Sequence, residues 1–405
     1  MKEYIIKSKK VRVKLFFSMF IGYMFFYFTR KSLIFVSPLV INDMNISLSE
    51  FGIINTSFYI VYAISKFISG IISDRSNPKY IMIFGLMFTG IFNMCIMFFS
   101  YNINLILIFW ILNAFFQGWG WPPINKYLSY FYSKNERGFW WSIYSLSHNL
   151  GGAIIPIIVG FLSISLGWKI SIGLVGFISV IMSFFLIKIM FEIPDISEKN
   201  LTKNYTISSF KNVFSILNNK NIWLLSFSYL FIYIIKTSIN DWTVLFLVNQ
   251  KKYDLVSAGI SIFYFELFGI LGMIFSGWIT DKFLFGHRIF YIFISANFLI
   301  VFSLIFWNIP AGYQKIDYII VGIIGFFIFG PQMLIGLIAS ECVSKNFACT
   351  SNGFVGTWGY LGAAITGYPF GFIINLSWNI YFFVIVLSSF ILMFIILILL
   401  IKEHV

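Results

Sequence analysis

Leu15–Pro38 reads LFFSMFIGYMFFYFTRKSLIFVSP, an apolar stretch long enough to cross a membrane. It carries Arg30 and Lys31 past its midpoint, without an acidic residue to accompany them. A charge near the centre of a membrane helix costs about 2.5–3.5 kcal/mol, and such residues usually face a cavity or a partner. A second stretch, Trp223–Val248, repeats the arrangement with Lys236 near its centre. The two stretches together predict a positively charged site for an anion.

The composition is that of a membrane protein with many spans. Of the 405 residues, 59% are hydrophobic and only 11% are charged, whereas a soluble domain has roughly 25% charged residues. Apolar runs of about 20 residues recur along the whole length, as helices that cross a bilayer require. The formal charge of +13 is spread over many loops rather than gathered on one face, so no nucleic-acid partner is predicted.

Several classes of active site are missing from the sequence. The three cysteines, Cys95, Cys342 and Cys349, lie in or beside apolar segments without the spacing of metal ligands, and we interpret them as packing residues. There is no nucleotide-binding loop of the GxxxxGK[ST] type and no HExxH motif. We therefore expect no metal, no cofactor and no ATP hydrolysis, so that any transport would be secondary. A membrane-embedded enzyme is disfavoured because no nucleophile–base pair stands out.

Twelve candidate spans fall into two groups of six on either side of a polar segment, residues 191–221. Their approximate limits are 15–38, 52–73, 80–100, 103–128, 139–164, 168–189, 222–248, 257–279, 288–309, 317–341, 350–374 and 379–401. This pattern predicts an all-α membrane protein with an N-terminal bundle in residues 1–190, a cytoplasmic linker in 191–221 and a C-terminal bundle in 222–405.

The basic residues predict the orientation of the chain. The terminal tails and the even-numbered loops hold nineteen Lys and Arg residues, and the opposite side holds only Lys169, Lys251, Lys252 and Lys315. Because positively charged loops stay in the cytoplasm, both termini are expected there. The basic start precedes a long apolar span without a cleavage site, which favours a retained first helix over a signal peptide.

The two halves of the chain are related. GIISDR follows the second span and GWITDK follows the eighth, and their acids, Asp74 and Asp281, lie 207 residues apart. Arg30 and Lys236 lie 206 residues apart. Two unrelated landmarks with nearly the same offset indicate a duplication of six helices. A parallel repeat of this kind places the substrate near the membrane midplane between the halves, where Arg30 and Lys236 would face each other.

The basic residues at membrane depth are the candidate substrate ligands. Arg30 offers a planar fork of donors that matches phosphate or carboxylate, Lys236 adds a compact charge, and Lys66 on the second span adds a third. The alternative is internal ion pairing, which is weakened because spans one to six contain no Asp or Glu in their apolar parts. Of the membrane-depth acids Asp241 and Glu266, the first is five residues from Lys236 and so points in a different direction.

His148, in YSLSHNLGG on the fifth span, is the only histidine in an apolar segment. An imidazole there can hydrogen-bond a phosphate oxygen or respond to its protonation near neutral pH. A packing histidine bonded to a neighbouring helix explains its position equally well.

The GxxSDR and GxxTDK loops are interpreted as gating and packing devices rather than substrate contacts. Gly70 permits close helix approach, while Asp74 and Arg75, like Asp281 and Lys282, can pair or cap adjacent helix ends. Glycine and proline also mark spans that are expected to bend, with QGWGWPP in the fourth span and FGPQ in the tenth. Membrane helices carry both residues for plain packing too.

These motifs resemble a known family. The GxxSDR loop and the six-plus-six plan resemble the major facilitator superfamily, which implies two pseudo-symmetric six-helix bundles. Within it, YFTRKSLIFVSPLV, YAISKFISGIISDR, QGWGWPPINK, WWSIYSLSHNLGG, KTSINDW and FGPQMLIG together resemble the organophosphate:phosphate antiporters. FGPQMLIGLIASE and NGFVGTWGYLGA are similar to the hexose-phosphate branch. The resemblance implies exchange of a sugar phosphate for inorganic phosphate by alternating access, with Arg30 binding the phosphoryl group.

One residue departs from the bacterial pattern. Bacterial members usually carry arginine at the position of Lys236, whereas the glucose-6-phosphate translocases are similar to this chain in having lysine. Lysine keeps the charge but loses the bidentate fork, so affinity and substrate preference are expected to differ. His148 matches the bacterial antiporters.

The sequence therefore predicts a monomeric twelve-helix antiporter for hexose 6-phosphate, with glucose 6-phosphate the expected solute. Arg30 and Lys236 would clamp the phosphoryl group, and Lys66, His148 and Lys31 would assist. The alternative is a receptor of the same fold that binds sugar phosphate and signals through a membrane kinase. The Ile, Phe, Lys and Asn bias indicates an AT-rich genome and favours the inner membrane of a bacterium.

Overall fold

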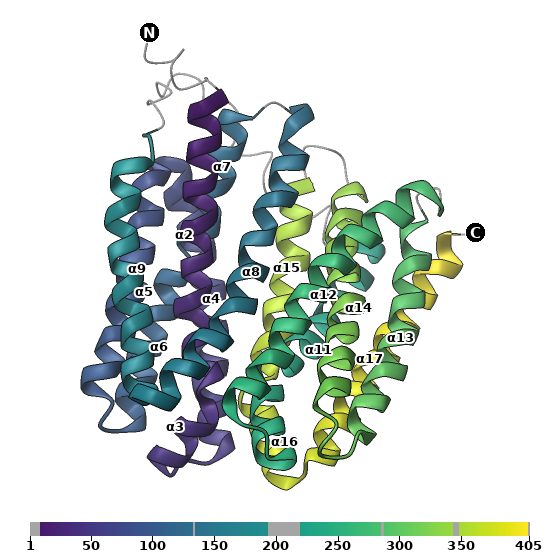
Figure 1. Ribbon diagram of the computed structural model, residues 1–405. Helices are drawn as coiled ribbons and strands as arrows, with labels where there is room; N and C mark the ends of the chain where they lie inside the picture. Colours follow the sequence, from purple (N-terminus) through teal and green to yellow (C-terminus); the bar gives the residue numbers. More distant parts are fainter. Residues whose placement is uncertain (1–8, 133, 193–218, 285–286, 343–347, 404–405) are drawn as a thin grey trace. The chain divides into compact units, whose positions relative to one another are not determined.

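Helices account for nearly all of the described residues of this protein. The computed structural model describes residues 9–132, 134–192, 219–284, 287–342 and 348–403, and no strand occurs among them (Figure 1). The chain divides into two compact units. The first lies within Met1–Pro194 and takes in Tyr253–Phe263, and the second lies within Asp195–Lys252 and Tyr264–Val405. The bundle limits predicted at residues 190 and 222 stay a prediction, since the description stops at 192 and resumes at 219.

The described residues up to 192 form eight helices, all in the first unit. They are α2 (Lys9–Phe35), α3 (Ser37–Met44), α4 (Leu48–Arg75), α5 (Pro78–Phe99), α6 (Ile103–Gln117), α7 (Trp121–Phe131), α8 (Lys134–Leu166) and α9 (Trp168–Ile189). Helix α2 packs against α8 and α9, and α5 packs along α9 (Figure 1). These contacts place α2, which carries Arg30, in the interior of the unit.

The described residues from 219 onward form seven further helices. They are α11 (Lys220–Lys251), α12 (Leu255–Lys282), α13 (Arg288–Asn308), α14 (Gln314–Glu341), α15 (Ala348–Ile365), α16 (Tyr368–Leu376) and α17 (Trp378–Glu403). Helix α11 packs against α14, α15 and α17 and holds the interior position that α2 holds in the first unit. Helix α12 begins in the first unit and continues into the second.

Each of the twelve predicted spans overlaps one helix or one broken pair of helices. Among the described residues, ten helical segments are long and apolar enough to cross a membrane. The two predicted spans outside this set are the second, formed by α4 with its embedded polar residues, and the eleventh, which α15 and α16 form in two pieces. Large apolar side chains such as Phe161, Ile164 and Phe394 are about 60% exposed or more, as a surface in contact with lipid requires.

Proline and glycine interrupt two of these spans. The fourth span is broken between α6 and α7 at Gly118–Gly120, just before two prolines that begin α7. Proline has no N–H to continue the helix and is favoured in a first turn, so a new helix begins there. The eleventh span breaks at Thr366–Gly367 in the same way, before Pro369. By contrast, α14 continues through Pro331 of the FGPQ motif without interruption.

A capping box fixes the start of α4, the helix that lines the site described below. The Ser47 hydroxyl accepts a hydrogen bond from the Glu50 N–H (3.2 Å), and the Glu50 carboxylate accepts one from the Ser47 N–H (2.7 Å). The hydrogen bonds that the Glu50 carboxylate accepts from the Ser47 N–H and from the Ser47 hydroxyl (2.9 Å) lower the pKa of this exposed carboxyl. The carboxylate is therefore kept charged beside the positive end of the helix dipole.

Helices α5 and α9 approach each other through facing glycines. A Cβ added at Gly176 would lie 2.5 Å from the Gly90 carbonyl oxygen, whereas a Cβ added at Gly353 on α15 would meet nothing within 4 Å. Gly176→Ala is therefore expected to lower stability by about 1–3 kcal/mol, because the helices must separate. Gly353→Ala is expected to be neutral or stabilising by up to about 1 kcal/mol, because alanine is the better helix former.

Thermal unfolding of the two purified variants in detergent checks this difference. Equal melting temperatures for Gly176→Ala and Gly353→Ala would show that α5 and α9 do not depend on the close contact.

Candidate functional site

The charge of Arg30 is buried against four aromatic rings. The residue is only 7% exposed, and its guanidinium carbon lies 4.5 Å from the ring centroid of Tyr62 and 5.3 Å from that of Tyr27. The centroids of Phe58 and Tyr59 follow at 5.5 and 5.8 Å. A cation over ring faces is stabilised by about 2 kcal/mol or more where water is excluded. The rings thus hold the guanidinium in place without cancelling its charge.

Helix α4 supplies most of these rings and a second cation. Phe58, Tyr62 and Lys66 are spaced by four residues and therefore share one face of the helix. The Lys66 ammonium lies 6.0 Å from the centroid of the same Tyr62 ring that covers Arg30. The neighbouring Ser65 hydroxyl donates a hydrogen bond to the Phe115 carbonyl at the end of α6. The break between α6 and α7 lies directly against this turn of α4, since a Cβ added at Gly118 would be 2.7 Å from the backbone nitrogen of Lys66.

His148 joins the same cluster from α8. Its ring centroid lies 5.5 Å from that of Tyr27, the ring on the other side of Arg30. One turn further along α8, a Cβ at Gly151 would lie 2.8 Å from the Tyr27 Cβ, so the backbones of α2 and α8 are close here. The first unit therefore brings three of the predicted ligands, Arg30, Lys66 and His148, into one cluster linked by Tyr27 and Tyr62.

Lys31 lies outside this arrangement. It is 6% exposed and thus also buried on α2. Successive residues of a helix point about 100° apart, so its side chain leaves α2 on a different face from that of Arg30.

A buried network of amides and hydroxyls sets the rotation of α2. Gln117 on α6 donates to the Thr29 hydroxyl (2.8 Å), and Asn93 on α5 donates to the Thr29 carbonyl (3.3 Å) and the Ser32 hydroxyl (3.1 Å). Asn113 in turn donates to the Asn93 side-chain oxygen (2.8 Å). Because these groups have no water to bond, breaking their contacts is costly. With Thr29 held against α5 and α6, the next residue, Arg30, is directed toward α4.

In the second unit, Lys236 is held by two residues of the FGPQ motif. Its ammonium donates a hydrogen bond to the Gln332 side-chain oxygen (3.0 Å) and lies 4.1 Å from the centroid of the Phe329 ring. The Gln332 amide nitrogen donates to the Tyr233 hydroxyl (3.2 Å). Tyr233 also packs against Tyr360 on α15, with the centroids 5.9 Å apart. A tyrosine-rich cluster around a buried cation therefore occurs in this unit as in the first.

The Glu266 carboxylate contacts α11 one turn beyond Lys236. The Asn240 amide on α11 donates to the Glu266 carboxylate on α12 (2.9 Å), and Glu266 is only 3% exposed. Asp241, the next residue on α11, is 2% exposed.

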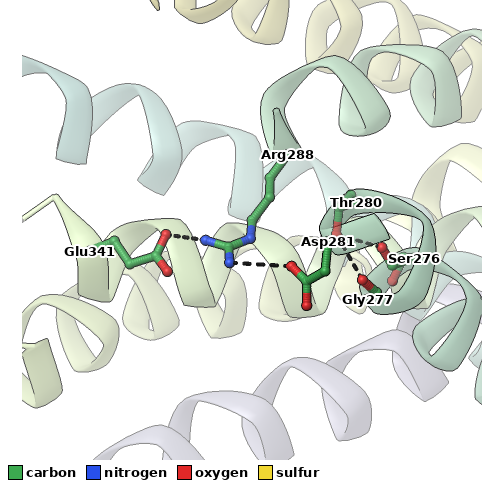
Figure 2. A network of polar contacts seen from close by, with 6 residues as sticks. All are labelled: Ser276, Gly277, Thr280, Asp281, Arg288 and Glu341. Carbon is green, nitrogen blue, oxygen red and sulfur yellow. Dashed lines mark hydrogen bonds and ion pairs between the residues drawn. The ribbon is translucent and has the colours of Figure 1, made fainter. Parts of the chain in front are cut away.

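The predicted gating acid of the second unit pairs with the next helix rather than with its neighbour in sequence. Asp281 lies 3.6 Å from the Arg288 guanidinium, which also donates a hydrogen bond to Glu341 on α14 (Figure 2). Arg288 therefore ties α12, α13 and α14 together at this end of the unit. Lys282 instead places its ammonium 5.8 Å from the Trp278 ring centroid.

The corresponding residues of the first unit can be placed only by their backbone. Gly70, Asp74 and Arg75 lie in the last turns of α4, and their side chains fall outside the described residues. A gating role for either loop stays a prediction.

Lys251 differs from its expected place in a loop. It ends α11 with its side chain only 4% exposed, in an ion pair with Asp317, whose side chain is 0% exposed. The ammonium also lies 5.3 and 5.6 Å from the ring centroids of Phe306 and Phe246. Burial lowers the pKa of Lys251, and Asp317 opposes this by raising it. Lys251 thus belongs to the end of α11 rather than to a connection, because the helix continues past the apolar span; its place on the side opposite the cytoplasm stays a prediction.

No group of three or more His, Cys, Asp or Glu side chains that could hold a metal ion occurs in the part of the chain that the structure describes. The clusters around Arg30 and Lys236 each place a cation against aromatic rings, and the Lys236 ammonium also donates to the neutral Gln332 amide.

Comparison with known proteins gives this arrangement a context. The family profile described as Major Facilitator Superfamily matches residues 19–367. A probable hexose phosphate transport protein of Chlamydia trachomatis is 40% identical to this chain over 395 residues, covering 89% of this chain and 84% of that protein. The membrane sensor protein UhpC of Escherichia coli is 37% identical, covering 92% and 88%.

The fold also matches a solved structure. A crystal structure of the nucleoside transporter NupG aligns with a TM-score of 0.78 at 14% identity, covering 96% of this chain and 99% of that one. At that identity the likeness concerns the fold alone, and it agrees with the all-α major facilitator fold that the sequence predicts.

Proposed function

Because the chain belongs to the Major Facilitator Superfamily, in its organophosphate:phosphate antiporter branch, we propose that it carries hexose 6-phosphate across a membrane in exchange for inorganic phosphate. The observation that carries the proposal is the Arg30 guanidinium, buried against four rings that leave its charge intact. The 40% identical relative named as a hexose phosphate transport protein supports the choice of solute. Glucose 6-phosphate is the first solute to test in transport assays.

The phosphoryl group is bound by cations from both halves of the chain. Arg30 engages two of its oxygens through the guanidinium fork, and Lys236 adds a point charge. Lys66 and His148 assist, since they share the Tyr62 and Tyr27 rings with Arg30. Lys31 was also predicted to assist, but its side chain leaves α2 on a different face from that of Arg30, and its part in binding stays a prediction. The solute is moved and not chemically converted.

Exchange follows from the charge of the site. An empty site that gathers several cations is costly to move across the membrane, because charge is expensive in the hydrocarbon core. A bound phosphate dianion cancels that charge and permits the change of access. Inorganic phosphate has the same oxygens as the phosphoryl group of the sugar and is the natural counter-substrate for the return.

Uptake of labelled glucose 6-phosphate into proteoliposomes tests the exchange. Vesicles loaded with inorganic phosphate are expected to take up the label at least about tenfold faster than vesicles loaded with an uncharged osmolyte, since outward return of the empty site is slow. Equal uptake into the two preparations would contradict obligatory exchange.

Lys236→Ala is expected to raise the half-saturating concentration of glucose 6-phosphate roughly 10- to 100-fold. The reason is the loss of one charge-assisted hydrogen bond, about 1.5–3 kcal/mol. Lys315→Ala is the matched control, because Lys315 is an exposed lysine at the start of α14 in the same unit. If both variants keep wild-type half-saturation, Lys236 is not a substrate ligand.

A receptor is the second candidate, favoured by the 37% identical relative named as a membrane sensor protein. A receptor would bind glucose 6-phosphate and signal to a partner kinase without moving the solute. Saturable binding to the purified protein together with zero uptake into loaded proteoliposomes would establish it.

The distribution of basic residues along the sequence supports a cellular location and an orientation. We propose that the chain works as a monomer in the inner membrane of a bacterium, with both termini in the cytoplasm. Nineteen basic residues in the tails and even-numbered loops, against four opposite, support this orientation.

A further inference from the structure

We propose that Gln332 is a positioning residue for substrate binding, which fixes the direction of the Lys236 ammonium and, being neutral, leaves its charge available to the phosphoryl group. This rests on the proposed function, which makes Lys236 a ligand of that group. The inference starts from the hydrogen bond between the Lys236 ammonium and the Gln332 side-chain oxygen, 3.0 Å long, which joins α11 to α14 across 96 residues of sequence.

Lysine needs such a support more than arginine does. Its ammonium is a point charge at the end of four rotatable carbons, whereas the guanidinium of arginine is a rigid planar fork. Two of the contacts that restrain Lys236 come from one face of α14, since Phe329 and Gln332 are three residues apart, and the Tyr233 ring on α11 adds a third at 5.7 Å. The Phe329 ring centroid lies 4.1 Å from the ammonium nitrogen, and the Gln332 oxygen accepts a hydrogen bond from the ammonium. The two contacts together define where the ammonium points.

The orientation of the Gln332 amide is itself fixed. Its nitrogen donates to the Tyr233 hydroxyl (3.2 Å), and Tyr233 precedes Lys236 by three residues on the same face of α11. The reverse orientation would set the amide N–H groups against the ammonium, donor against donor. Both ends of the amide are therefore used by neighbouring side chains of α11, and the oxygen can only face Lys236.

The neutrality of the amide decides what the site can bind. A carboxylate at this place would form an ion pair with Lys236 and compete with the phosphoryl oxygens. An apolar side chain would leave the ammonium without this acceptor, so that it would explore more conformations and lose more freedom on binding. Glutamine restrains the lysine and adds no negative charge beside it. The FGPQ motif thus raises substrate affinity by restraining Lys236, and Gln332 is the residue of the motif that does so.

Two substitutions separate restraint from charge. Gln332→Met keeps the length of the side chain and removes the acceptor, and Gln332→Glu keeps the acceptor and adds a negative charge. In phosphate-loaded proteoliposomes, we expect Gln332→Met to raise the half-saturating concentration of glucose 6-phosphate about 3- to 10-fold, and Gln332→Glu to raise it at least about 30-fold. The maximal rate is expected to stay within about twofold for Gln332→Met, because the interaction acts on binding.

Asn297→Leu is the control, because the Asn297 amide donates only to the Phe293 carbonyl of its own helix, α13, in the hydrogen bonds described for it (2.9 Å). It is expected to keep wild-type half-saturation. A purely structural role of Gln332 would lower the amount of folded protein or the maximal rate and leave half-saturation unchanged. If Gln332→Glu does not fold, Gln332→Met answers the question through the same split between half-saturation and maximal rate.

Lys236→Ala, measured in the same assay, separates the role of Gln332 from the role of Lys236 as a substrate ligand. Raised half-saturation in Lys236→Ala together with wild-type half-saturation in the Gln332 variants overturns the role of Gln332 and leaves the proposed function standing. Wild-type half-saturation in Lys236→Ala overturns the place of Lys236 in the site, and the inference fails with it. The expected result is raised half-saturation in all three variants, with Gln332→Glu above Gln332→Met.

Discussion

Arg30→Ala is expected to reduce uptake of glucose 6-phosphate into phosphate-loaded proteoliposomes at least about 100-fold. The change removes a buried guanidinium that offers two parallel hydrogen bonds to phosphoryl oxygens. Each charge-assisted bond contributes about 1.5–3 kcal/mol, and every 1.4 kcal/mol is a factor of ten. Arg30→Lys keeps the charge and loses the fork, so we expect an intermediate loss, closer to tenfold.

Arg12→Ala is the matched control for this measurement. Arg12 is an arginine at the start of the same helix, α2, where its guanidinium lies 5.6 Å from the ring centroid of Tyr132. The rise of a helix places it about 27 Å along the axis from Arg30. Transport by Arg12→Ala within a few-fold of wild type is expected. Uptake by Arg30→Ala at the level of this control would remove the basis of the proposed site.

Asp317→Ala is expected to destabilise the second unit by about 3–5 kcal/mol, the cost of leaving one member of a buried ion pair alone. Asp317 raises the pKa of Lys251 against the effect of burial, so its removal leaves a buried ammonium that is favoured to lose its proton. For a unit of this size, the loss corresponds to a fall in melting temperature of roughly 10 °C. The double variant Lys251→Met/Asp317→Leu is expected to recover most of it, because apolar residues of similar volume replace buried ion pairs well.

Unfolding of the detergent-solubilised protein measures this effect, and Lys169→Ala is the control. Lys169 pairs with Asp43 at 3.5 Å, but both side chains are about half exposed. Breaking an exposed pair costs at most about 1 kcal/mol. Similar small shifts for Asp317→Ala and Lys169→Ala would show that the Lys251–Asp317 pair contributes no more than a surface contact.

Much of the fold could be predicted from the sequence because membrane helices carry a strong local signal. Long apolar runs marked the spans, and the six-residue loop motifs marked the repeat. The break in the fourth span was expected from QGWGWPP, since proline and glycine act on their own backbone. The same reasoning predicted a bend at FGPQ. There, however, α14 continues through Pro331 as one helix.

The site was predicted less completely, since its geometry depends on contacts between helices. A charged residue in an apolar span is conspicuous, so Arg30 and Lys236 stood out. The tyrosines around them did not, because an aromatic residue is common in membrane helices and only packing shows which rings face a cation. Gln332 was quoted within FGPQ as part of a bend, and its contact with Lys236 lies 96 residues away in sequence. Asn93 and Asn113 were overlooked for the same reason, although amides in apolar spans are a usable signal.

Local sequence also misled the pairing of charges. The GWITDK loop places Asp281 beside Lys282, but Asp281 pairs with Arg288 on the following helix (Figure 2). The pairing of Lys251 with Asp317 was not predicted, because the two residues are 66 positions apart in sequence. Charge pairs are fixed by the register of packed helices, and that register has no local signature in one sequence.

The most direct test of the account is the release of labelled inorganic phosphate from proteoliposomes when glucose 6-phosphate is added outside. Exchange through one site predicts prompt efflux that requires the external sugar phosphate, is matched by its uptake, and is lost in Arg30→Ala but kept in Arg12→Ala. Phosphate efflux that proceeds at the same rate without external glucose 6-phosphate, or sugar-phosphate uptake with no phosphate released, would contradict the account.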